Sequence, residues 1–190
     1  MNHFFAYLFK TKHIKRWGLM RNTQEENIKE HSFDVALLAH GLAVITNVYF
    51  DGDVDAEKVM ALGLLHEVGE IFTGDMPTPI KYYSPKIREA YDEVEEIAME
   101  KIIAMLPEEM RKIYAPLLMQ EDEALYLYVK MADKLSAYIK CVEELKSGNR
   151  EFEKAKIKIG EELIQMDHPA LQYFMQHFLP SYGLTLDELN

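Results

Sequence analysis

The chain lacks the features expected of a membrane-inserted or secreted protein. No hydrophobic run approaches the roughly 20 residues that span a bilayer, and the first residues have no apolar stretch followed by a cleavage site. The single cysteine, Cys141, cannot form an internal disulfide, and its apolar helical surroundings favour a packing role. We therefore expect a cytoplasmic protein with no membrane partner.

Positive charge is scarce as well. The sequence has 21 Lys and Arg against 32 Asp and Glu, which gives a formal net charge of −11. This balance argues against binding a nucleic-acid polymer, because a polyanion requires an extended positive surface. No acidic residue precedes Glu25, however, and the first 21 residues carry Lys10, Lys12, His13, Lys15, Arg16 and Arg21. That segment suits a small anion.

Strand alternation, internal repeats and interdomain linkers are also missing, and apolar residues recur at helical spacing. The sequence predicts an all-α fold with one domain over residues 1–190. A glycine and two prolines break the helical pattern in the loop 73–79. The expected helices cover 4–9, Asn27 to a turn at 50–53, Asp55 into His66, Ser84 to about Met105, Pro107 to about Leu118, Glu123 to Lys146, and two further segments, the second running from Pro169 to Phe178.

One short segment concentrates an imidazole and two carboxylates. On a helix, His66, Glu67 and Glu70 would converge on one side. A core histidine with solvated acids is the simpler interpretation, but the neighbouring residues are apolar or small. A carboxylate buried without a partner costs several kcal/mol, and a cation would compensate. A zinc-peptidase motif is excluded because position 70 is glutamate where a second histidine is required.

Two distant residues extend this cluster. Asp133 interrupts an apolar helix, although an ion pair with Lys130 or Lys134 would also explain it. His31 stands near a helix start, where a histidine often caps or packs. Each residue alone is weak evidence, and the set of acids and imidazoles suggests a metal site.

Several motifs occur in an order that resembles the HD-domain superfamily, and more narrowly the bacterial HD-domain 5′-deoxynucleotidases. The similarity runs nearly end to end. The motifs are Arg16-Trp17-x-Leu19-Met20-Arg21-Asn22, Glu30-His31-Ser32, His66-Glu67, Thr73-Gly74-Asp75-x-Pro77-Thr78-Pro79-x-Lys81-Tyr82, Ala132-Asp133 and Cys141-x-Glu143-Glu144-Leu145.

This resemblance implies an HD-type helical bundle that binds a divalent transition metal. Mixed imidazole and carboxylate ligands suit manganese, cobalt, zinc or iron without selecting among them. The implied metal ligands are His31, His66, Glu67 and Asp133. The implied catalytic residues are Glu70 and Asp75, and the implied substrate-binding residues are Arg16, Trp17, Asp75 and Lys81. The family also implies a homodimer.

Each implied role has a chemical reason. Glu70 can orient a water molecule and accept its proton, while Asp75 can hold a sugar hydroxyl or pass a proton to the leaving oxygen. The planar guanidinium group of Arg16 can donate two parallel hydrogen bonds to a phosphate. The alternative interpretation is an exposed surface charge. Trp17 would exclude a ribose 2′-hydroxyl, unless it is a core residue.

One position departs from the family pattern. The motif has aspartate where this chain has Glu67. The extra methylene of glutamate displaces the carboxylate, and metal–ligand distances tolerate deviations of only about 0.2 Å. The expected activity is hydrolysis of deoxyribonucleoside 5′-monophosphates to deoxynucleosides and phosphate. Two alternatives stay open: hydrolysis of another nucleotide phosphate ester on the same scaffold, and a non-catalytic nucleotide-binding protein with a weakened metal site.

Overall fold

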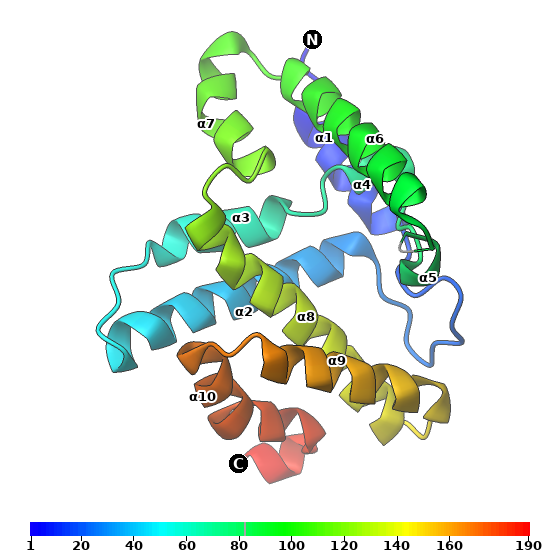
Figure 1. Cartoon of the computed structure of the whole chain (residues 1–190), viewed down its shortest axis with the longest axis vertical. Coiled ribbons are helices and arrows are strands. Elements are labelled where there is room, and N and C mark those ends of the chain that lie inside the picture. Colours follow the sequence, from blue (N-terminus) through cyan, green and yellow to red (C-terminus); the bar gives the residue numbers. More distant parts are fainter. Residues whose placement is uncertain (82) are drawn as a thin grey trace.

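Helices form the regular structure of this computed structural model, which describes residues 1–81 and 83–190 (Figure 1). No strand occurs within those two ranges, as the all-α prediction requires. Tyr82, the last residue of the motif that begins at Thr73, lies outside the described residues. The elements are α1 (Phe4–Leu8), η1 (Phe9–His13), α2 (Ile28–Tyr49), α3 (Ala56–Leu65), α4 (Glu70–Thr73), α5 (Thr78–Lys81), α6 (Pro85–Ala104), α7 (Glu108–Leu118), α8 (Glu123–Lys146), η2 (Arg150–Phe152), α9 (Glu153–Gln165), α10 (Pro169–His177), η3 (Leu179–Gly183) and η4 (Leu186–Leu189).

Local capping residues explain where the main helices begin. Asn27 and Glu30 form a reciprocal capping box at the start of α2. The side chains of Asp55, Ser84 and Asp122 accept backbone hydrogen bonds at the starts of α3, α6 and α8. These starts agree with the sequence predictions.

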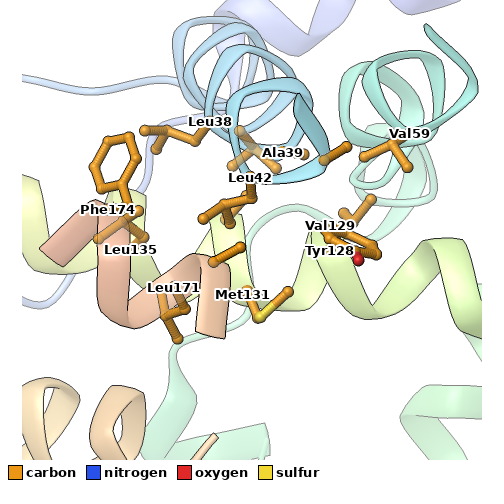
Figure 2. Packing of buried hydrophobic residues seen from close by; sticks show 14 of the residues in the cluster. Leu38, Ala39, Leu42, Val59, Tyr128, Val129, Met131, Leu135, Leu171 and Phe174 are labelled. Carbon is orange, nitrogen blue, oxygen red and sulfur yellow. The ribbon is translucent and has the colours of Figure 1, made fainter. Parts of the chain in front are cut away.

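The main core lies where α2, α3, α8 and α10 meet (Figure 1). Figure 2 shows the packing of their buried side chains, among them Leu42 of α2, Val59 of α3, Met131 of α8 and Leu171 of α10. Burial of such side chains is the dominant stabilising contribution to a fold of this size. The crossing of α2 with α8 also brings His31 close to Asp133.

Helix α2 contradicts the expectation that no apolar stretch is long enough to span a bilayer. By length and composition it would be able to cross a membrane, and it is the one such helix among the described residues. In the structure, 44% of its most apolar window is buried. Its Val35, Ala39 and Leu42 pack in the core, which gives its apolar composition a structural reason.

A second apolar cluster supports the segment that follows α3. Leu65 and Val68 pack there with Met99 and Ile102 of α6 and Phe4 of α1. Leu117 of α7 touches both clusters and joins them. The chain around His66 is thereby held between the two cores.

The expectation that His66, Glu67 and Glu70 lie on one continuous helix is wrong. The helix ends at Leu65, residues 66–69 form turns, and α4 starts at Glu70. Backbone hydrogen bonds in this segment span three residues, as from Glu70 N–H to Glu67 O (3.1 Å) and from Val68 N–H to Leu65 O (3.2 Å). The tighter turn changes the directions of His66, Glu67 and Glu70 from those on a regular α-helix.

Candidate metal centre and substrate site

The fold brings together the four residues expected to bind a metal. His31 comes from α2, His66 and Glu67 from the turn after α3, and Asp133 from the middle of α8. One ligand atom from each of the four lies within 4.8 Å of all the others. The His31 and His66 rings are 5.2 Å apart between centroids.

The hydrogen bonds of the two histidines leave the correct nitrogen free for a cation. His66 Nδ1 lies 2.7 Å from the Gly63 carbonyl oxygen, which can only accept, so Nδ1 carries the proton. His31 Nδ1 lies 3.3 Å from Ser136 Oγ. Both Nε2 atoms are buried without a hydrogen-bond partner among the described residues. Such orphaned nitrogens beside carboxylates fit a bound divalent cation.

The alternative explanation of Asp133 as a surface ion pair does not hold. Lys134 Nζ pairs with Glu162 Oε2 at 2.6 Å, and Lys130 Nζ lies over the Tyr126 ring. Asp133 Oδ1 instead lies 3.1 Å from His31 Nε2, while 40% of the Asp133 side chain stays exposed. Asp133 therefore faces the histidine cluster and an open side of the site.

Glu67 reaches the cluster despite its extra methylene. Its Oε1 lies 3.3 Å from His66 Nε2. Burial alone would raise the pKa of Glu67, but the interactions with His66, Glu70 and Arg16 keep it well below its usual value. These interactions favour the ionised carboxylate, which lies within the cluster.

Acidic groups are crowded around this centre. Burial, together with repulsion from Glu67 and Asp75, raises the pKa of Glu70 to about 11. Burial would also raise the pKa of Asp133, but its interaction with His31 and the charge of Arg16 lower it to about 2. A divalent cation next to these groups would favour the ionised form of Glu70 as well.

Arg16 lies inside the site and is not a surface charge. Only 13% of its side chain is exposed. Burial tends to lower the pKa of Arg16, but the nearby carboxylates of Asp133, Glu26 and Glu67 raise it. Arg16 is thus a buried cation among acids, and its Nε has no hydrogen-bond partner in the described chain.

Trp17 has a backbone conformation that is rare for a large side chain. Its φ is 57°, in the left-handed region. The indole Nε1 donates a 2.8 Å hydrogen bond to Glu26 Oε2, and the ring lies 5.3 Å from that of Phe152. Trp17 also lines a cavity, so it is not simply a core residue.

Two cavities meet at Asp133. The larger, of about 750 Å³, is lined by Arg16, Trp17, Asp75 and Asp133 together with residues of α8 and α9. The smaller, of about 370 Å³, is lined by His66, Glu67, Glu70, Lys81 and Asp133. The cluster therefore opens to both sides.

Lys81 lies apart from the other expected substrate-binding residues. It lines the smaller cavity, whereas Arg16 and Trp17 line the larger one. Its Nζ is 3.4 Å from Glu95 Oε1 and lies over the Tyr91 ring. Its expected role beside a phosphate stays a prediction.

Sequence reasoning missed several residues that hold the site in place. Ser136 follows Asp133 by three positions on α8, so helical spacing was a usable signal. Glu26 lies between two recognised motifs and has no local signal of its own, and neither has Gly63. Their roles depend on contacts across the fold.

Solved structures define the class of this fold. An HD-domain phosphohydrolase from Listeria innocua superposes with a TM-score of 0.80 at 24% identity, covering 95% of this chain and 88% of its own. The cyanophage S-2L HD phosphohydrolase DatZ, solved with dA and one catalytic Zn²⁺, gives a TM-score of 0.66 at 22% identity, covering 95% and 96%. The fold is that of the HD-domain phosphohydrolases.

Sequence comparisons narrow this class to a family. A family model described as YfbR-like 5′-deoxynucleotidase matches residues 3–182. A 5′-deoxynucleotidase from Photobacterium profundum is 48% identical over 100% of this chain and 98% of its own length. One from Cronobacter sakazakii is 49% identical over 100% and 96%. The chain belongs to the YfbR-like 5′-deoxynucleotidase family.

Proposed function

We propose that this protein is a metal-dependent phosphomonoesterase that hydrolyses deoxyribonucleoside 5′-monophosphates. The observation that carries the proposal is the cluster of His31, His66, Glu67 and Asp133, in which two buried Nε2 atoms, without a hydrogen-bond partner among the described residues, lie beside two carboxylates. Arg16 and Trp17 line the adjoining cavity, where Arg16 could bind the phosphate and Trp17 could contact the sugar. The names of the relatives at 48% and 49% identity support the same activity.

The four clustered residues are the proposed ligands of a divalent cation of manganese, cobalt, zinc or iron. When bound, the cation would lower the pKa of a water molecule and withdraw charge from the phosphoryl group. The Zn²⁺ in DatZ makes zinc the first ion to test.

The remaining residues have distinct proposed tasks. Arg16 binds the phosphate oxygens, and Glu70 orients the attacking water and accepts its proton as the new oxygen–phosphorus bond forms. The bond from phosphorus to the 5′-oxygen then breaks. Burial raises the pKa of Asp75, so this residue retains a proton more readily and can deliver it to the departing oxygen.

A substrate panel tests the activity. Purified protein is supplied with each metal in turn and mixed with deoxyribonucleoside and ribonucleoside monophosphates and with nucleoside triphosphates, and released phosphate is measured. We expect release from the deoxyribonucleoside monophosphates and its loss in Glu70→Ala. Preferred hydrolysis of another ester would support the first alternative. Metal binding without any hydrolysis would support the non-catalytic one.

We also propose that the protein is a cytoplasmic homodimer that binds no nucleic-acid polymer. Exposed apolar side chains such as Phe33 and Leu37 of α2 support self-association, and the net charge of −11 argues against a polyanionic partner. Sedimentation equilibrium at several concentrations tests the dimer, and a monomer at all of them contradicts it.

A further inference from the structure

Glu26 contacts both the proposed substrate-binding residues and a proposed metal ligand. Its side chain is 12% exposed. One oxygen, Oε2, accepts the 2.8 Å hydrogen bond from Trp17 Nε1 and lies 3.6 Å from Arg16 Nε. The other, Oε1, lies 3.7 Å from His31 Nδ1. One buried carboxylate thus lies between the proposed substrate-binding pair and a proposed metal ligand.

This geometry resembles the general arrangement in which a carboxylate supports a metal-binding histidine from its far side. His31 points Nε2 at the metal cluster and Nδ1 at Ser136 and Glu26. Ser136 Oγ is the hydrogen-bond partner of Nδ1, and the negative charge of Glu26 Oε1, 3.7 Å away, further favours the orientation of the ring and the basicity of Nε2. Loss of such an outer partner typically weakens metal binding about 10- to 100-fold.

We propose that Glu26 is a positioning residue that couples the metal centre to the substrate-binding pair Arg16 and Trp17. When a metal binds His31, the interaction of His31 with Glu26 Oε1 changes. The resulting shift of the Glu26 side chain moves the indole of Trp17, which is hydrogen-bonded to Oε2. Conversely, Glu26 holds Trp17 and Arg16 in place only while its charge is retained. The inference rests on the proposed metal site.

The side chain of Glu26 is not needed to close the loop that carries it. The main chain does so, because Arg16 N–H donates to the Glu26 carbonyl at 3.0 Å and Ile28 N–H donates to Ile14 O at 3.0 Å. Glu144 separately holds Thr23 and Gln24. Side-chain variants at position 26 should therefore keep the fold, and their effect reports on positioning.

Trp17 provides a direct readout because it is the only tryptophan in the chain. Zn²⁺ is titrated into metal-free wild-type protein while indole emission is recorded and binding is followed by calorimetry. We expect the emission to change in proportion to metal occupancy. Metal binding with unchanged Trp17 emission would overturn the coupling without any variant.

The variant Glu26→Gln keeps the size of the side chain and an acceptor for the indole but removes the charge. Glu25→Gln is the matched control, since Glu25 is exposed and pairs only with Lys15 at 2.6 Å among the described residues. We expect Glu26→Gln to lose the emission change, bind Zn²⁺ about 10- to 100-fold more weakly and show a raised KM for deoxyribonucleoside monophosphates. The control should match the wild type.

Circular dichroism checks that Glu26→Gln is folded, and Glu26→Asp, which keeps the charge, serves if it is not. Glu26→Asp should retain a partial emission change. A folded variant that behaves like Glu25→Gln in emission, Zn²⁺ affinity and KM overturns the inference. If wild-type protein binds no Zn²⁺ or releases no phosphate, the proposed function fails instead, so the two failures are distinguishable.

Discussion

The glutamate at position 67 lies in the acid and histidine cluster although its side chain is one methylene longer than the aspartate expected there. Its Oε1 lies 3.3 Å from His66 Nε2, and the turn at 66–69 in place of a helix sets the direction of both side chains. We expect Glu67→Gln to lose bound metal, because the amide lacks the negative charge that a divalent cation requires. Glu67→Asp should retain metal, since it restores the residue type of the family motif.

Metal content after dialysis against a limiting metal, measured by mass spectrometry, checks this expectation. Glu57→Gln is the control, because Glu57 is exposed in the first turn of α3. Metal retained in Glu67→Gln at the level of the control would remove Glu67 from the ligand set.

Trp17 is expected to determine sugar selectivity. Its ring lines the larger cavity and is held by Glu26 and by contact with Phe152. Trp17→Ala should increase the ratio of kcat/KM for ribonucleotides over deoxyribonucleotides by about tenfold or more, the range that shape exclusion gives. Trp17→Phe, which keeps a flat ring, should change the ratio less. An unchanged ratio in Trp17→Ala would contradict this role.

The clustering of the four proposed metal ligands was predictable from the sequence, whereas the residues that contact them from behind were not. His31, His66, Glu67 and Asp133 were found because acids and imidazoles in apolar surroundings need compensation and because their order matches a known pattern. Glu26 and Gly63 act through hydrogen bonds to residues distant in space or through a main-chain carbonyl. No spacing rule in a single sequence marks such contacts.

Helix α8 holds the loop that carries Arg16 and Trp17 in place. Glu144 on α8 is buried and accepts hydrogen bonds from Thr23, Gln24, Lys140 and Asn149. These contacts give Glu144 of the Glu143-Glu144 motif a structural role. The same helix supplies Asp133, so α8 positions one residue of the cluster as well as the loop that carries Arg16 and Trp17.

We expect Glu144→Gln to lower the free energy of unfolding by about 3 kcal/mol at pH 7, because it leaves the buried ammonium of Lys140 without its partner charge. Burial would raise the pKa of Glu144, but hydrogen bonds from Lys140 and Thr23 hold it far below its usual value. A lowered folded-state pKa contributes stability above the unfolded value of about 4.3 and loses it as the pH falls.

Urea unfolding between pH 7 and pH 3 measures both effects. The difference between wild type and Glu144→Gln should be largest at pH 7 and shrink below about pH 4.3. Glu143→Gln is the neighbouring control, since Glu143 is exposed. A difference that stays constant down to pH 3 would show that the charge of Glu144 is not the cause.

Helix starts were predictable because caps are local, as Asn27, Asp55 and Ser84 illustrate. The end of α3 was not. Residues 62–72 have a continuous helical pattern, and the break after Leu65 arises where Leu65 and Val68 pack against α6 and α1. A tertiary contact there overrides the local helical preference.

For the whole molecule, the metal centre is where α2, the turn after α3 and α8 converge, and it collects more negative charge than Arg16 can balance. A bound cation should therefore stabilise the entire fold. A metal supplied at 100 times its Kd adds about 2.7 kcal/mol to the free energy of unfolding. For a chain of this length, that corresponds to a rise in Tm of about 5–10 °C.

Calorimetric scans of chelator-treated protein with and without added Zn²⁺ measure this shift. His66→Gln should abolish it, because His66 Nε2 is a proposed metal-binding nitrogen that has no hydrogen-bond partner among the described residues. His40→Gln, at a partly exposed position on α2, is the matched control and should show the full rise. Equal Tm values with and without metal in the wild type would mean that no cation links these three segments, and the crowded carboxylates would then need another source of compensation.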